Sequence, residues 1–314
     1  MQSGGIRSES LAIRLDGAAG SPSDETTLHV ERIRPAVTPE RLGRPVFMLH
    51  GSLSNGRVFY SRSGKGLAPF LARQGYDVYI GDLRGRGGSR PRIAPGASHG
   101  QNESIRQEIP AMIREIRRLR GAIPQHWVAH SWGGVLSYSV LARFPEYRSW
   151  VRSMVLLATR RSIRQNSWGV FWKFHFFWHH VAQWLAKRKG YLPAREWRFG
   201  ADNETILSLA ECSRWVKPGP WIDARDGFDY GEAIKDADLP PSLWLAGAGD
   251  TDIAHPRDVR DFAVETGSRD LELHVLGKRN GNAVDYGHAA ILTHPEAAEE
   301  IFPMIGSWLH RHDG

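Results

Sequence analysis

The sequence predicts an α/β protein with a mostly parallel central sheet that helices cover on both faces. Short, continuous apolar segments of strand length recur along the chain, and stretches of helical periodicity separate them. This alternation is typical of parallel strands joined by crossover helices. A second observation agrees: the apolar strand at 127–130 runs into a Ser among small residues, and a helical pattern starts directly after it. With 41% hydrophobic and 24% charged residues among 314, the composition is that of a globular protein.

The first elements differ from the rest. Residues 8–15 and 26–34 alternate apolar with polar side chains around a turn rich in Gly, Ser, Pro and Asp. This pattern predicts an antiparallel hairpin at a sheet edge. Buried strands are then expected at 45–49 and 77–80. The first is a continuous apolar run, and runs of this length without alternation suit strands buried on both faces.

Helices are expected between and after these strands, around 66–74 and over 103–120. The second is amphipathic, with its apolar residues on one stripe. Pro110 lies inside it, so we expect a kink or a late start. After the segment around 131, another buried strand is predicted at 151–158.

The alternation of strands and helices stops between residues 160 and 239, a stretch dense in aromatic residues. We interpret it as a cap inserted over the site, although a packed subdomain without substrate contact would have the same composition. The alternation then resumes with a strand at 242–247, a helix near 256–266, a strand at 271–276 and an amphipathic closing helix. The predicted division is therefore a core of 1–159 and 240–314 with a cap of 160–239.

The stretch around Ser131 has the form of a nucleophile elbow, in which a strand turns sharply on a Ser and a helix begins. Small residues two positions to either side allow such a strained turn to pack closely, and here they are Ala129 and Gly133. A Ser hydroxyl is a poor nucleophile near pH 7. It needs a base within hydrogen-bond reach and a third group that orients the base.

Asp250 and His288 are the candidates for these two roles. Each follows a predicted strand, where the loops at the carboxyl edge of a parallel sheet converge. Asp252 is an alternative acid, but Asp250 stands directly at the strand end. We expect the backbone N–H of Trp132 to be one oxyanion-hole donor.

The second oxyanion donor is expected in the turn after the strand at 45–49. It is the N–H of Ser52, with that of Leu53 as the alternative. For the substrate pocket, we predict a small group of apolar side chains. They are Leu53, Trp168, Phe171 and Trp172.

These motifs resemble the α/β-hydrolase superfamily along nearly the whole chain, in His50-Gly51, in the stretch 82–89, in the Ser131 elbow, in 247–250 and in Gly287-His288. Three stretches are further similar to the acid lipase branch that includes the gastric and lysosomal lipases: 67–81, 108–113 and Gly287-His288 with its following helix. The resemblance implies an α/β-hydrolase fold with Ser131 as nucleophile, Asp250 as acid and His288 as base. The chain departs from the branch in having Ala129 for the usual Gly and Ala290 for a frequent Asp.

The residues and the resemblance together favour a serine hydrolase that cleaves carboxylic esters with a hydrophobic part, through an acyl-enzyme on Ser131. The expected substrate is a small-molecule or lipid-like ester. Two alternatives stay open: an acyltransferase or lactonase with the same three residues, and a ligand-binding protein that keeps the fold without turnover. Relatives with an Asp nucleophile, such as dehalogenases, are disfavoured because the elbow carries Ser.

Composition argues against several other classes. A single cysteine, Cys212, excludes an internal disulfide. His175 and His179 are four residues apart, but no acidic third ligand is near, so we expect no metal and no cofactor. The Arg/Gly run at 84–92 is explained by a loop at a strand end, and no nucleic-acid partner is expected.

The net charge of +7 is spread along the chain and would suit transient contact with a membrane surface. No run of 18 apolar residues occurs, and the first seven residues lack the basic-then-apolar layout of a secretory signal. We therefore expect a cytoplasmic protein. The oligomeric state is left open.

Overall fold

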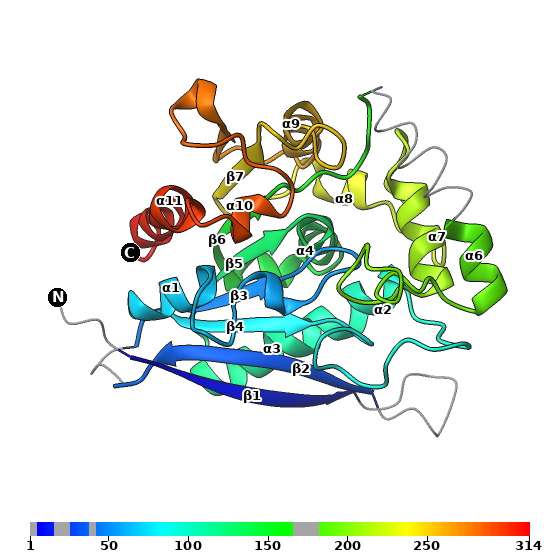
Figure 1. The fold of residues 1–314 in the computed structure, drawn as a ribbon, viewed down its shortest axis with the longest axis horizontal. Coiled ribbons are helices and arrows are strands. Elements are labelled where there is room, and N and C mark those ends of the chain that lie inside the picture. Colours follow the sequence, from blue (N-terminus) through cyan, green and yellow to red (C-terminus); the bar gives the residue numbers. More distant parts are fainter. Residues whose placement is uncertain (1–4, 16–25, 38–41, 166–181) are drawn as a thin grey trace.

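The computed structural model describes residues 5–15, 26–37, 42–165 and 182–314. These residues form one sheet of eight strands in the order β1-β2-β4-β3-β5-β6-β7-β8 (Figure 1). Strand β2 runs antiparallel to both neighbours, and every pair from β4 to β8 is parallel. The strands are β1 (Ile6–Leu15), β2 (Thr26–Pro35), β3 (Pro45–Leu49), β4 (Asp77–Asp82), β5 (Gln125–His130), β6 (Val151–Leu157), β7 (Ser242–Gly247) and β8 (Leu271–Leu276). The predicted α/β fold is confirmed.

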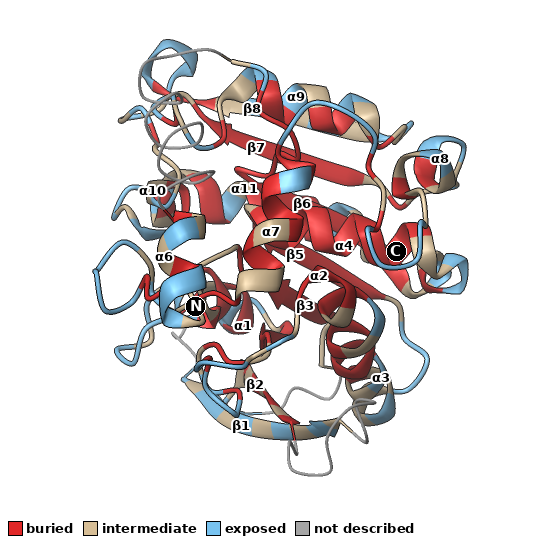
Figure 2. Cartoon of the chain, turned by 90° about the vertical axis from the view of Figure 1, so that its right-hand side faces the viewer, coloured by how far each residue is buried: buried red, intermediate tan, exposed pale blue. Residues whose placement is uncertain are grey.

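Burial along the strands follows the sequence pattern. Every residue of β3, β4, β5 and β7 is buried, whereas β1 has no buried residue and alternates half-buried with exposed positions over much of its length (Figure 2). Strands with two covered faces need apolar side chains on both, which explains their continuous apolar runs. The alternating hairpin forms the edge of the sheet, as predicted.

Helices pack on both faces of the sheet. One hydrophobic core joins α3 (Ile109–Arg120), α4 (Trp132–Arg143), α8 (Tyr230–Lys235) and α9 (Pro256–Glu265) to residues such as Phe47 and Trp127. The opposite core joins α1 (Leu67–Arg73), α10 (Ala290–Thr293) and α11 (Ala297–Arg311) to the alternate residues Val46 and Val128. Because adjacent residues of a strand point to opposite faces, each inner strand supplies both cores.

The expected helix at 103–120 is divided in the structure. A short α2 (Gln101–Glu103) passes into a π-helical segment (Ser104–Glu108), and α3 then begins at Ile109 with Pro110 in its first turn. Proline is tolerated there because the first N–H groups of a helix have no partner inside it. The predicted irregularity near Pro110 is confirmed.

The chain between β6 and β7, called here the β6–β7 insertion, contains α6 (Ala182–Lys189) and α7 (Ile206–Trp215) before α8. Figure 1 shows α6 and α7 beyond the ends of the strands, on the side opposite the chain's N-terminus. A small hydrophobic cluster of its own holds α6, α7 and the segment around Leu192 together. Among the described residues, no helix is long and apolar enough to cross a membrane.

Candidate active site

The elbow places Ser131 alone between the last residue of β5 and the first of α4. Its backbone has φ 54° and ψ −126°, an uncommon conformation for a residue other than glycine. Such strain costs on the order of 1–3 kcal/mol and persists where surrounding contacts fix it. Here the Ser131 N–H donates to the Leu157 carbonyl at 2.8 Å, and Thr159 Oγ1 donates to the Ser131 carbonyl at 3.1 Å.

Gly133 is required for the elbow to pack against β3. A Cβ at this position would lie 2.6 Å from the carbonyl oxygens of both Leu49 and His50, closer than any real Cβ contact. Ala129, on the other side of Ser131, is fully buried in the core and its single methyl is accommodated there. The small residues expected around the nucleophile therefore have unequal importance, and Gly133 is the strict one.

The structure brings Ser131, His288 and Asp250 into a continuous hydrogen-bonded chain. His288 Nε2 lies 2.9 Å from Ser131 Oγ, and His288 Nδ1 lies 2.6 Å from Asp250 Oδ2. A carboxylate only accepts, so Nδ1 carries the proton and Nε2 is left to accept from the Ser131 hydroxyl. The side chain of Asp252 contacts Thr251 instead, at 3.4 Å.

Asp250 is suited to remain ionised although it is only 3% exposed. Burial raises the pKa of a carboxyl, but the hydrogen bond from His288 and the N–H groups of Ala254 and Ile253 lower the pKa of Asp250 below its ordinary value. A buried negative charge then faces the imidazole ring. This arrangement orients His288 and stabilises its protonated form.

The turn that follows β3, residues 50–56, passes directly beside Ser131. Because it carries the expected oxyanion donors, it is called here the oxyanion turn. A Cβ at Gly51 would lie 2.8 Å from Ser131 Cβ and 3.2 Å from Ser131 Oγ, so only glycine allows this approach. Within the described part of the chain, the N–H groups of Ser52 and Leu53 donate to no other protein group. Both expected donors thus lie on the turn that meets Ser131.

A family model described as the α/β hydrolase fold matches residues 44–295. The chain belongs to the α/β hydrolase fold family. The match includes all three members of the hydrogen-bonded chain and the whole oxyanion turn.

Two curated lipases share part of their sequence with this α/β hydrolase. Lipase 3 of Drosophila melanogaster is 31% identical over 144 residues, which are 43% of this chain and 36% of the lipase. Gastric triacylglycerol lipase of Homo sapiens is 27% identical over 129 residues, 38% of this chain and 32% of the lipase. The matches span about a third of the length of each lipase. They agree with the resemblance to the acid lipase branch.

Solved structures of α/β hydrolases superpose on nearly the whole chain. A haloalkane dehalogenase, DbeA from Bradyrhizobium elkani, gives a TM-score of 0.65 at 17% identity and covers 98% of this chain and 99% of its own. An esterase, EaEST from Exiguobacterium antarcticum, gives 0.60 at 17% identity and covers 96% of this chain and 100% of its own. At this identity the likeness shows the fold alone.

In this α/β hydrolase, the buried His50 ring stabilises the oxyanion turn through hydrogen bonds. The Leu83 N–H donates to His50 Nε2 at 3.2 Å, so the ring proton is on Nδ1, which lies 2.8 Å from the Gly51 carbonyl. Burial lowers the pKa of His50 to about 4, which keeps the ring neutral. His50 therefore bonds the loop that carries it.

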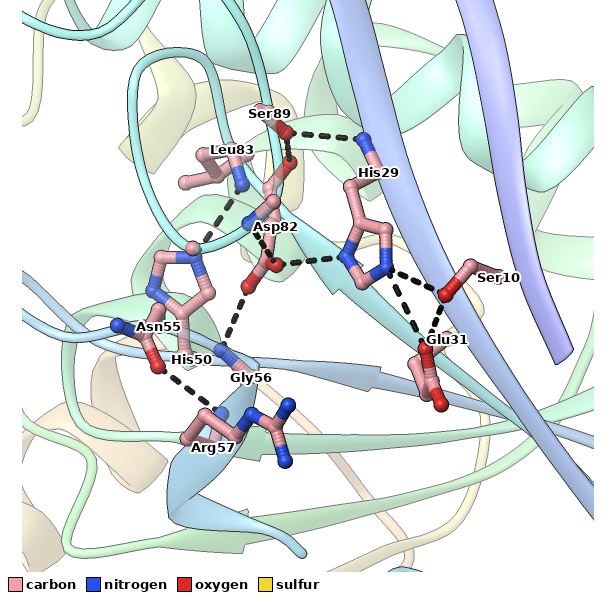
Figure 3. Close-up of polar contacts among 12 residues, drawn as sticks. Ser10, His29, Glu31, His50, Asn55, Gly56, Arg57, Asp82, Leu83 and Ser89 are labelled. Atoms are coloured by element: carbon pink, nitrogen blue, oxygen red, sulfur yellow. Dashed lines mark hydrogen bonds and ion pairs between the residues drawn. The ribbon is translucent and has the colours of Figure 1, made fainter. Parts of the chain in front are cut away.

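Asp82, at the end of β4, fixes the outer side of the same turn. Its carboxylate accepts from the N–H of Gly56 at 2.7 Å, from the N–H of Gly88 at 2.7 Å and from His29 Nδ1 at 2.8 Å. Figure 3 shows the His29 ring between Asp82 on one side and Glu31 on the other. Its bond to Gly88 ties the glycine-rich loop, residues 83–89, to the end of β4.

His29 was not among the expected site residues. It is the cross-strand partner of Asp82 between β2 and β4, and a pairing across a sheet edge is not visible in one sequence. Both of its ring nitrogens face carboxylates, because Nε2 lies 3.3 Å from Glu31 Oε2. The hydrogen bonds to Asp82 and Glu31 raise the pKa of His29 to about 9. The His29 ring is therefore positively charged at neutral pH.

His130, the neighbour of the nucleophile, supports His288. Its Nε2 donates to the His288 carbonyl at 3.0 Å, and the two rings lie 4.9 Å apart. Burial lowers the pKa of His130 to about 3, so the ring is neutral.

Of the predicted pocket residues, the structure describes only Leu53. Leu53 lies on the oxyanion turn with φ 55° and its side chain half-buried. Trp168, Phe171 and Trp172 lie outside the described residues, as do His175 and His179. In the described part of the chain, no three His, Cys, Asp or Glu side chains are grouped so that they could hold a metal ion.

Proposed function

We propose that this α/β hydrolase cleaves carboxylic esters with Ser131 as nucleophile, His288 as general base and Asp250 as the group that orients the base. The observation that carries the proposal is the pair of short contacts on His288, 2.9 Å to Ser131 Oγ and 2.6 Å to Asp250 Oδ2. A base within hydrogen-bond reach of the hydroxyl is what a Ser nucleophile requires. The partial matches to lipases support the same class of reaction.

In the first half-reaction, Ser131 Oγ bonds to the ester carbonyl carbon while its proton moves to His288 Nε2. The carbonyl oxygen takes up the displaced electron pair and accepts hydrogen bonds from the N–H groups of Trp132 and Ser52. Collapse of this intermediate breaks the bond to the alcohol oxygen. The alcohol takes the proton from His288 and leaves an acyl group on Ser131.

In the second half-reaction, water replaces the alcohol. It gives a proton to His288 Nε2 as its oxygen bonds to the acyl carbon, and the second intermediate expels Ser131 Oγ, which regains the proton. The free acid is released. Each backbone donor of an oxyanion hole contributes about 3–4 kcal/mol, because it acts on charge that is fully developed only in the transition state.

A hydrophobic substrate is favoured by the aromatic side chains near the elbow and on the β6–β7 insertion. The Trp132 ring, next to Ser131, lies 6.2 Å from the ring of Trp215 on α7. On the insertion, Trp184, Trp197 and Phe199 are 55%, 41% and 40% exposed. Basic side chains stand beside two of these rings. Burial of apolar substrate surface against such rings would supply binding energy.

The test is hydrolysis of p-nitrophenyl esters with acyl chains of two to sixteen carbons, with Ser131→Ala as the matched variant. We expect turnover that rises toward moderate or long chains, and a loss of roughly 10⁴- to 10⁶-fold in kcat for Ser131→Ala. Turnover that Ser131→Ala retains would exclude the proposed nucleophile. Added alcohols or amines that divert the acyl group from water would indicate the acyltransferase alternative.

A further inference from the structure

A short segment of the β6–β7 insertion docks onto the oxyanion turn. We call residues 200–205 the anchor segment. The N–H groups of Ala201 and Asp202 both point to the Leu53 carbonyl, at 2.7 and 3.3 Å. A Cβ at Gly200 would lie 2.9 Å from Leu53 Cβ, so only glycine lets the two backbones approach this closely. The insertion therefore contacts the main chain that carries the expected oxyanion donors.

Asp202 makes the most specific contacts of the anchor segment. It is 3% exposed, and its Oδ2 accepts from Asn55 Nδ2 at 2.6 Å and from the Gly87 N–H at 2.8 Å. Its Oδ1 lies 3.3 Å from Arg92. One carboxylate thus joins the end of the oxyanion turn to the glycine-rich loop after β4. A buried carboxylate with several donors is held in one position, because each lost bond would leave a polar group unsatisfied.

A further contact ties the insertion to the same region. In the anchor segment, Glu204 forms a buried ion pair with Arg86 of the glycine-rich loop. The oxyanion turn is therefore held from the core by Asp82 and His50, and from the insertion by the anchor segment.

The conformation of Leu53 explains why the turn needs this support. Its φ of 55° is left-handed, which a leucine adopts only where its surroundings fix it. The carbonyl of the same residue accepts both N–H groups of the anchor segment. If these contacts were lost, the Ser52 and Leu53 peptide groups would be free to rotate away from the elbow.

We propose that Asp202 is a positioning residue for the oxyanion hole, and that the β6–β7 insertion thereby sets the rate of the reaction as well as covering the site. The inference rests on the proposed function. Asp202 touches no reacting atom and acts through Asn55 and Gly87 on the backbone of the turn. Because oxyanion bonds strengthen only in the transition state, a misplaced turn lowers kcat and leaves KM nearly unchanged.

The experiment compares Asp202→Ala with Asp223→Ala. Asp223 is also 3% exposed and lies in the same insertion, but it binds Asn102, Arg143 and Tyr230 instead of the oxyanion turn. Both variants lose a buried carboxylate and both should lower Tm. For Asp202→Ala we expect kcat to fall about 10- to 100-fold with KM within about twofold of the wild type. For Asp223→Ala we expect kcat within about twofold.

Asp202→Asn is the rescue variant. Its amide oxygen can still accept from Gly87 and Asn55. Only the contact with Arg92 is lost, because an NH₂ group cannot accept from a guanidinium, so most of kcat should return. Asn55→Ala removes the other end of the contact. It should lower kcat by a similar factor, and the double variant with Asp202→Ala should lose little more than either alone.

The proposal is overturned if Asp202→Ala keeps the wild-type kcat, or if Asp223→Ala loses as much. Should Asp202→Ala fail to fold, Asn55→Ala decides by the same criterion. A wild type that cleaves no ester and takes no fluorophosphonate on Ser131 would overturn the proposed function, and the positioning role with it. A wild type that turns over and is matched by Asp202→Ala would overturn the positioning role alone.

Discussion

At the scale of single residues, three buried side chains around Ser131 and His288 are held in different charge states. Asp250 is an anion that accepts from His288, whereas His50 and His130 are neutral because burial lowers their pKa values to about 4 and 3. The N–H of the neutral His50 ring donates to the Gly51 carbonyl, and the N–H of the neutral His130 ring donates to the His288 carbonyl. Only His288 is left with an acceptor nitrogen facing the nucleophile.

This division of roles predicts that Asp250 and Asp252 differ in their importance for activity. Asp250→Asn keeps the shape but presents an NH₂ group or an amide oxygen to Nδ1, which weakens the orientation of His288 and its protonated form. We expect a loss of about 10³- to 10⁴-fold in kcat. Asp252→Asn should stay within about twofold of the wild type. Steady-state kinetics on one ester measures both, and equal losses would contradict the assignment of the acid.

At the scale of elements, the site depends on close contact between the elbow and the end of β3. Gly133 lies in the first turn of α4, and a side chain there would press on the carbonyls of Leu49 and His50. The same two residues lead into the oxyanion turn. Packing of one helix start against one strand end therefore fixes the nucleophile and the turn together.

Gly133→Ala should accordingly destabilise the fold and misplace the turn. We expect a loss of about 1–3 kcal/mol in the free energy of unfolding, typical of overpacking, with a clear loss of kcat. Gly231→Ala is the control: its Cβ would have neighbours only at 3.4 and 3.8 Å in α8, and alanine favours a helix by up to about 1 kcal/mol. Denaturant unfolding measures both. Stability unchanged in Gly133→Ala would contradict the packing argument.

Elements with both faces buried could be predicted from the sequence, because apolar content alone identifies β3 and β7. The start of β5 was less clear: Gln125 and His126 are polar yet fully buried. Their side chains bond the Ile113 carbonyl and Ser153, partners that only the folded chain supplies. The π-helical segment before α3 likewise had no sequence pattern beyond Pro110.

The same distinction applies to the site. Ser131, Asp250 and His288 were predictable because Ser131 directly follows β5, Asp250 lies just after β7 and His288 lies in the loop that follows β8. Strand ends of a parallel sheet meet at one edge. His29 and Asp202 were not predictable, since their positions depend on strand order and on the path of the β6–β7 insertion. For His29, the one available indication was Glu31, a charged residue two positions away in the same alternating strand.

At the scale of the whole molecule, the edge hairpin is linked to the site by the His29 cluster. Glu31 accepts from His29 and from Ser10 of β1, while Asp82 accepts from His29 and from the N–H of Gly56 in the oxyanion turn. The hydrogen bond from His29 lowers the pKa of Glu31 to about 2, against its own burial. A cation between two carboxylates thus joins β1, β2 and β4 to the turn.

This cluster predicts a pH dependence of stability. The pKa of His29 rises from 6.5 to about 9 on folding, so its contribution is fully present below pH 6.5 and is lost as the pH rises through 9. We expect wild-type Tm to fall over this window by about 1.5–3 °C more than that of His29→Gln, for a contribution on the order of 1–2 kcal/mol.

His274→Gln, which changes an exposed histidine on β8, serves as the control and should keep the wild-type profile. Thermal unfolding followed by circular dichroism from pH 5 to 10 measures all three proteins. If the Tm values of the wild type and His29→Gln changed in parallel with pH, the cluster would make no pH-dependent contribution to stability.

The central claim is that Ser131 carries the acyl group of a cleaved ester, and the most direct measurement is its capture. The protein is mixed briefly with a p-nitrophenyl ester, or with a fluorophosphonate, quenched in acid and digested with trypsin, which releases residues 121–143 as one peptide. Mass spectrometry should find the added mass on this peptide, with fragment ions placing it on Ser131 and not on Ser137 or Ser139. Ser131→Ala should show none. Ester turnover without any adduct at Ser131, or with the adduct on another residue, would contradict the account.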